Sequence, residues 1–152
     1  MKFSDIIQLD AIVEDLKAKN KPEVIKELSG AVAPMAGAEA QDVAIVLMER
    51  ETLSSTGIGG GIAIPHGKLP SVKSIAVGFG RSIKGIDFDS LDNRPVHLFF
   101  LLLTPEHSTG GHLKVLAQIS KRLKMNQFKE RLLSAESTEQ IYQVIVENDE
   151  EF

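Results

Sequence analysis

The run of residues 96–103, VHLFFLLL, constrains the fold more than any other segment of this chain. A nearly continuous apolar run of this length is typical of a strand that is buried on both faces of a sheet. Such a strand needs other elements to cover both of its faces. A second strand is predicted at residues 74–81, where large apolar residues alternate with smaller ones. Lys84 and Gly85 are typical of a turn, and residues 86–88 are predicted to form a separate short strand.

Helical spacing of apolar residues predicts helices before and after these strands. Asn20 and Pro22 favour a helix start, because Asn caps free backbone N–H groups and Pro suits the first turn. Pro34 and Gly37 are expected to end this helix. Further helices are predicted at residues 39–51, 112–125, 126–133 and 138–146, and the acidic residues 147–151 are expected to fray. This order of elements predicts a single α/β (α+β) domain, residues 1–152, with a mixed parallel/antiparallel sheet flanked by helices on both sides.

The composition excludes several classes of function. The chain has 152 residues, which suits one domain with its own core, and its net charge of −4 argues against general nucleic-acid binding. It contains no cysteine, which excludes a disulfide, a thiolate nucleophile and a cysteine-based metal site. The N-terminus has no signal-peptide core, and the longest apolar run is too short to span a bilayer. A cytoplasmic protein is therefore expected.

Residues 54–68, SSTGIGGGIAIPHGK, contain the strongest candidate site. Glycines allow backbone N–H groups to approach an anion, because no Cβ is in the way. The apolar residues before Pro65 predict a short buried strand that ends at this proline and presents His66 at its end. Gly67 is expected to leave open space beside the imidazole ring.

Other motifs do not fit the chain. A P-loop requires GxxxxGK followed by Ser or Thr, but the spacing of the glycines is one residue too long and Leu69 follows the lysine. The dinucleotide motif GxGxxG also fails. No HExxH pattern is present, so no metal site is predicted. Of the other histidines, His97 is expected to be a hydrogen-bonded structural residue in a strand, and His107 a solvated loop residue.

The imidazole of His66 can act as a general base, a metal ligand or a nucleophile. No GxSxG elbow is present for a hydrolase triad. Phosphoryl acceptance needs a neutral, reachable ring nitrogen and fixed donors for the charge of the transferring group. Arg50 either complements the dipole of its helix or supplies a fork of N–H donors to phosphate. His112, near a helix start, lies where an anion is favoured. Further candidate donors are the backbone at Gly57, Gly59 and Gly61 and the hydroxyls of Ser55 and Thr56.

The pattern STGIG-x-GIAIPHGK resembles the active-site signature of the mannitol/fructose-type EIIA domains of the bacterial phosphoenolpyruvate-dependent phosphotransferase system. The resemblance extends over nearly the whole chain and departs at Gly60, where relatives often carry Asn, Glu or Lys. It implies that His66 accepts a phosphoryl group from a histidine-phosphorylated carrier. It also implies that His112 stabilises the phospho-form and that Arg50 stabilises the phosphate charge.

The resemblance further implies the partners. The phosphoryl donor would be HPr or its nitrogen-branch homologue, and the acceptor would be an EIIB or a regulatory target protein. Because no transmembrane segment and no cysteine-bearing module is fused to the chain, it resembles the stand-alone nitrogen-regulatory EIIA proteins most. A free-standing EIIA that passes phosphate to an EIIB cysteine in fructose or mannitol uptake is the alternative, and a metal-dependent hydrolase is an alternative from another class. No cofactor, nucleic-acid partner or membrane insertion is expected.

Overall fold

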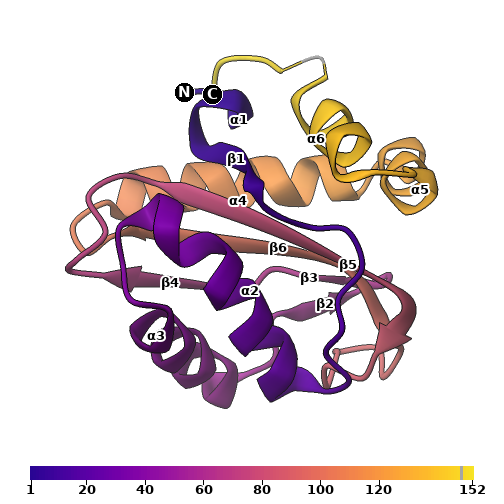
Figure 1. Ribbon diagram of the computed structural model, residues 1–152, viewed down its shortest axis with the longest axis horizontal. Coiled ribbons are helices and arrows are strands. Elements are labelled where there is room, and N and C mark those ends of the chain that lie inside the picture. Colours follow the sequence, from indigo (N-terminus) through magenta and orange to yellow (C-terminus); the bar gives the residue numbers. More distant parts are fainter. Residues whose placement is uncertain (148) are drawn as a thin grey trace.

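The sheet is built around the strand predicted from the long apolar run, and the computed structural model describes residues 1–147 and 149–152 (Figure 1). This strand, β6, pairs antiparallel with β5 on one side and parallel with both β3 and β4 on the other. β1 and β2 extend the sheet at its two edges. The strands are β1 (Ile7–Val13), β2 (Gly57–Gly59), β3 (Ile62–Ala63), β4 (His66–Leu69), β5 (Ala76–Ile86) and β6 (Val96–Pro105). The predicted mixed sheet is confirmed.

Helices cover both faces of the sheet, as predicted (Figure 1). Two early helices pack on one face, and the late helices pack with the N-terminal turn on the other. The helices are α1 (Phe3–Ile6), α2 (Lys21–Ala36), α3 (Ala40–Leu53), α4 (Thr109–Leu123), α5 (Asn126–Ser134) and α6 (Thr138–Val146). No helix among residues 1–147 and 149–152 combines the length and the apolar character that crossing a membrane requires.

Alternate residues of β6 enter two separate cores. Phe99 and Leu101 pack with the buried side chains of α2 and α3, whereas Phe100 and Leu102 pack with those of α4 and α6. All four are almost completely buried. Burial of one such side chain stabilises the fold by about 1.5–3 kcal/mol, so β6 holds the two layers of helices together.

The start and end of α2 follow from specific residues. The side chain of Asn20 accepts a hydrogen bond from the Glu23 amide at 3.0 Å, which confirms the predicted cap. Gly37 ends the helix in the left-handed conformation, with φ 69°. The prediction that Pro34 also ends the helix was wrong, because this proline lies inside the last turn and removes only one N–H from the helical ladder.

The strand β5 is longer than predicted. Lys84 and Gly85 do not form a turn, and Ile86 does not begin a separate strand. Instead the register with β6 shifts between Arg81 and Ile86, so the extra residues are absorbed by a bulge. Gly85 has φ 85°, a conformation that residues other than glycine rarely adopt. The bulge therefore needs a glycine here, and in the sequence this glycine looks like a turn residue.

The C-terminal tail is tied to the N-terminus rather than frayed, and the two chain ends lie side by side in Figure 1. The carboxylate of Asp149 accepts hydrogen bonds from the amides of Phe3 and Ser4 at 2.9 and 2.8 Å. The prediction of a frayed tail at residues 147–151 was therefore wrong for Asp149, while residue 148 lies outside the described residues.

Candidate functional site

Pro65 places His66 at the start of a strand. β3 ends at Ala63, and β4 begins at His66, which pairs with Leu102 of β6. The Leu102 amide donates to the Pro65 carbonyl at 2.9 Å, so the chain remains attached to β6 across the break. Pro65 therefore lies between two short strands that both pair with β6, and the sheet continues past the proline.

Gly67 allows a close approach of two elements. A Cβ at this position would lie 2.5 Å from Cγ1 of Val46 on α3. The expected open space beside the imidazole is therefore wrong, because the helix fills the volume on this side. The consequence is a rigid seat for His66, with α3 pressed against the next residue of the strand.

The hydrogen bond of His66 defines its tautomer. Nδ1 of the ring lies 2.7 Å from the carbonyl oxygen of Ile64, and a carbonyl only accepts, so Nδ1 carries a proton and donates. In the neutral ring, Nε2 then has a free lone pair. Burial lowers the pKa of His66; the Ile64 carbonyl opposes this, the positive charge of Arg50 lowers the pKa further, and Glu51 raises it. The ring is therefore neutral and nucleophilic at pH 7.

His112 lies beside His66, in the first turn of α4. The ring centroids are 5.3 Å apart in an edge-to-face arrangement. Nδ1 of His112 lies 2.7 Å from Oγ1 of Thr104, a buried residue of β6. Burial, followed by the charges of His66 and Lys68, lowers the pKa of His112 to about 4. The structure thus brings two neutral imidazoles together from segments that are far apart in the sequence.

Arg50 is close enough to influence His66 and also caps its own helix. Nη1 of Arg50 donates to the Ser54 carbonyl at 2.9 Å, at the C-terminal end of α3. This contact is the structural role that the sequence allows for Arg50. A guanidinium has five N–H groups, so others remain for an anion beside His66. Both interpretations of Arg50 are compatible with the structure.

The glycine-rich loop forms a tight hairpin between β2 and β3. Gly59, Gly60 and Gly61 all have positive φ, which explains why glycine is needed through this turn. Gly57 pairs with Ala63 in the adjoining strand. The Gly57 amide is already used inside the fold: it donates to Oγ of Ser55 at 3.0 Å, and Ser55 Oγ donates to the Phe88 carbonyl at 2.9 Å.

Glu51 holds the beginning of this loop and was not predicted to be functional. Its buried carboxylate accepts from the Thr56 amide at 3.1 Å, from the Thr56 hydroxyl, and from Nζ of Lys21 at 3.0 Å. The hydroxyls of Ser55 and Thr56 are thus both used within the fold. The one signal in the sequence is that Glu51 follows Arg50 directly, at the end of a helix.

Lys68 contacts the start of the helix that carries His112. Lys68 lies two residues after His66 in β4, and its Nζ donates to Oγ1 of Thr109 at the start of α4 at 3.0 Å. His97 has Nδ1 2.9 Å from the Ser82 carbonyl, as expected of a structural histidine, and His107 is exposed, as expected. Among the described residues, no three His, Cys, Asp or Glu side chains are grouped to hold a metal ion.

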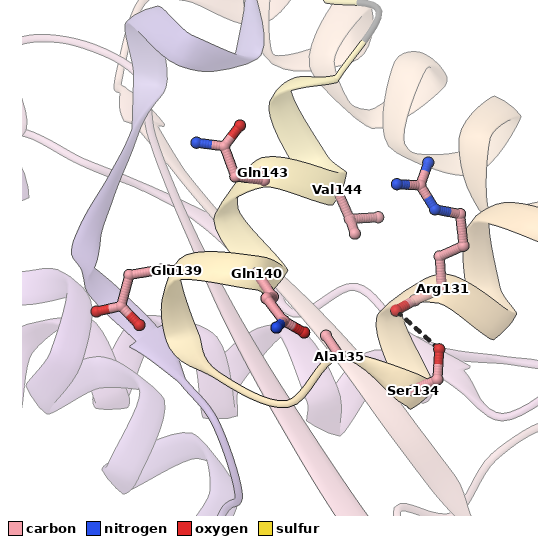
Figure 2. A pocket seen from close by; sticks show the side chains of 7 residues that line it. All are labelled: Arg131, Ser134, Ala135, Glu139, Gln140, Gln143 and Val144. Carbon is pink, nitrogen blue, oxygen red and sulfur yellow. Dashed lines mark hydrogen bonds between the residues drawn. The ribbon is translucent and has the colours of Figure 1, made fainter.

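A cavity of about 400 Å³ lies between α5 and α6, and its lining side chains come from these helices and their connection (Figure 2). Arg81 of β5 is buried and donates through Nη1 to the carbonyls of Leu132 and Ala135 at 2.8 and 2.7 Å. The cavity shares no lining residue with the His66 region. The cavity is therefore not part of the candidate site around His66.

Comparisons with known proteins identify the family. The sequence model of the family described as "Phosphoenolpyruvate-dependent sugar phosphotransferase system, EIIA 2" matches residues 5–148. The chain belongs to this family. It is therefore a component of a phosphotransferase system, and the resemblance in the STGIG and IPHG segments is confirmed as a family relationship.

Similar proteins come from both branches of this EIIA family. The "Nitrogen regulatory protein" of Bradyrhizobium diazoefficiens is 39% identical over 145 residues, which cover 95% of each chain. The "PTS system fructose-specific EIIABC component" of Bacillus subtilis is 38% identical over 98% of this chain, which spans only 24% of that protein's length. The crystal structure of "Nitrogen Regulatory Protein IIA-Ntr" from Neisseria meningitidis matches with a TM-score of 0.88 and 34% identity, covering 94% of this chain and 98% of that one.

Proposed function

We propose that this EIIA chain carries a phosphoryl group on Nε2 of His66, received from a phosphohistidine of HPr or its nitrogen-branch homologue. The observation that carries the proposal is the hydrogen bond from Nδ1 to the Ile64 carbonyl, which leaves Nε2 free. In the transfer, the lone pair of Nε2 forms the new N–P bond while the N–P bond of the donor breaks, and its electron pair returns to the donor imidazole. Each ring keeps the proton on its other nitrogen, so no base is needed.

Two neighbouring residues are suited to the charge of the transferring group. Phosphoryl transfer depends mainly on positioning and on fixed electrostatic partners. Arg50 already acts on His66 through its charge, and its planar fork suits phosphate oxygens. His112, with its ring centroid 5.3 Å from that of His66, is within reach of a phosphoryl group on Nε2. The loop of residues 55–60 shapes the site rather than binding the phosphoryl group, because the hydroxyls of residues 55 and 56 and the amides of residues 57 and 60 already make hydrogen bonds inside the fold.

The test is phosphorylation in a purified system of phosphoenolpyruvate, enzyme I and HPr. The wild-type chain is expected to take up one phosphoryl group in an acid-labile, alkali-stable linkage. His66→Ala should take up none, whereas His97→Ala, which replaces a structural histidine, should be labelled like wild type. Labelling of His66→Ala to the wild-type level would refute the proposal.

We further infer that the phosphoryl group on His66 controls a protein contact, as expected of a nitrogen-regulatory EIIA. The identities to two nitrogen-regulatory proteins over nearly their whole lengths support this branch. A phosphoryl group adds a charge of about −1.5 to −2 beside the first turn of α4, where His112 lies next to His66, and this changes the surface that a partner meets. Affinity capture with phosphorylated and unmodified protein should recover different partners.

The alternative output is relay to an EIIB cysteine. The similarity to the EIIA part of a fructose-specific EIIABC component supports it. Mixing the phosphorylated chain with a purified fructose-type EIIB distinguishes the two. Rapid transfer to the EIIB cysteine, together with equal partner recovery from both forms, would favour uptake over regulation.

A further inference from the structure

A buried hydroxyl lies directly behind His112. Thr104 is on β6, is completely buried, and faces His112 with Oγ1 2.7 Å from Nδ1 of the ring. The central strand thus reaches the second histidine of the site, as it reaches His66 through the pairing of Leu102. The contact is polar, so it adds nothing to the hydrophobic core, and Thr104 takes no direct part in the proposed phosphoryl transfer.

The direction of this hydrogen bond follows from the surroundings of Thr104. A hydroxyl has one proton to donate, and a buried donor without an acceptor is strongly disfavoured. Among the described residues, the hydrogen-bond partner of Thr104 Oγ1 is Nδ1 of His112. If Nδ1 carried a proton and donated to Oγ1, the hydroxyl proton would have no acceptor. The hydroxyl is therefore the donor, and Nδ1 of His112 is the acceptor.

We propose that Thr104 is a positioning residue that fixes His112 in the tautomer with its proton on Nε2. His66 has the opposite tautomer, because its Nδ1 donates to the Ile64 carbonyl. One ring then offers a lone pair to phosphorus, and the other offers an N–H to a phosphoryl oxygen. The tautomers of the two rings are set by two different partners. For His66 the partner is the Ile64 carbonyl, and for His112 it is the side-chain hydroxyl of Thr104 on the central strand.

This assignment explains how a neutral histidine can stabilise an anion. His112 is buried and does not need a positive charge to donate from Nε2, provided that Nδ1 is kept free of the proton. With the other tautomer, Nε2 would present a lone pair toward the phosphoryl oxygens, which is repulsive. The role of His112 in the phospho-form rests on the proposed function, whereas its tautomer does not.

The experiment compares Thr104→Val, which keeps the shape and removes the hydroxyl, with Thr104→Ser, which keeps the hydroxyl. Ser29→Ala is the matched control, because the buried Ser29 hydroxyl has no hydrogen-bond partner among the described residues. Ring-nitrogen NMR of the unmodified proteins at pH 7 reports the tautomer of His112. The lifetime of the phosphorylated form reports its consequence.

In wild type, Thr104→Ser and Ser29→Ala, we expect the proton of His112 on Nε2. In Thr104→Val we expect the proton of His112 to shift toward Nδ1. The phosphorylated form should then decay about tenfold faster, because the phosphoryl group loses one hydrogen bond from His112, and a hydrogen bond to a charged group is worth about this much. A proton on Nδ1 in the wild type, or an unchanged tautomer and lifetime in Thr104→Val, would overturn the proposal. If no variant accepts phosphate, the proposed function fails, and the wild-type NMR spectrum still decides the tautomer. The same spectrum decides it if Thr104→Val does not fold.

Discussion

The contact between Gly67 and α3 makes a quantitative prediction about the seat of His66. In Gly67→Ala, the new Cβ lies 2.5 Å from Cγ1 of Val46, about 1 Å closer than the contact distance of roughly 3.5 Å or more between carbons. Valine on a helix has one strongly preferred rotamer, so the side chain cannot turn away and α3 must shift. Overpacking of this kind costs about 1–3 kcal/mol of unfolding free energy.

Urea denaturation measures this loss, and a melting temperature lowered by about 2–12 °C should accompany it. Gly30→Ala is the control, because a Cβ on Gly30 in α2 meets no atom within 4 Å and should stabilise the helix by about 0.5–1 kcal/mol. In a Val46→Ala background, Gly67→Ala should cost almost nothing, because the colliding methyl group is gone. A penalty of the same size with and without Val46, or a Gly67→Ala protein as stable as wild type, would refute the close contact as the reason for this glycine.

Three further predictions concern charge. Arg50→Ala should slow phosphoryl transfer by on the order of 10²-fold, while Arg94→Ala, at an exposed loop position, should leave it unchanged; equal rates in all three proteins would leave Arg50 only its role as a helix cap. Arg81→Met should lower the unfolding free energy by about 2–4 kcal/mol in urea, because it leaves buried carbonyls of the α5 end unpaired, and a stable variant would show that water replaces the guanidinium. The pKa of His112 is lowered from 6.5 to about 4, so below pH 6.5 the unfolded chain binds a proton on this ring that the folded chain does not, and the fold loses stability as the pH falls from 6.5 toward 4; above pH 6.5 the ring is neutral in both states and has no such effect. His112→Gln should therefore show a smaller acid-induced loss of stability than wild type, by about 2–3 kcal/mol after allowance for solvent screening, and identical pH profiles would contradict the low pKa.

The layered fold is largely predictable because local signals agree with the global arrangement. The apolar run of β6 requires cover on both faces, and Asn20 and Gly37 mark the ends of α2 by cap chemistry. The departures occur where tertiary contacts override local signals. Gly85 is a bulge residue because β6 continues beside it, and Asp149 is ordered because the N-terminal amides meet it.

The candidate site is predictable only in part for the same reason. The sequence marks His66, because proline and glycines adjoin it, and family resemblance marks Arg50 and His112. Sequence spacing does not reveal that Thr104 faces His112 or that Glu51 holds Thr56, since these contacts arise from packing. Nor does it reveal that Gly67 is needed for the approach of a helix rather than for open space.

The most direct test of phosphoryl transfer to His66 is the position of the phosphorus on its ring. Phosphorus–nitrogen correlation NMR of the phosphorylated, nitrogen-labelled chain distinguishes the two ring nitrogens. Because Nδ1 donates to the Ile64 carbonyl, we expect phosphorus to be bonded to Nε2 of His66 and Nδ1 to keep its proton. A bond from phosphorus to Nδ1, or to any other residue, would contradict it.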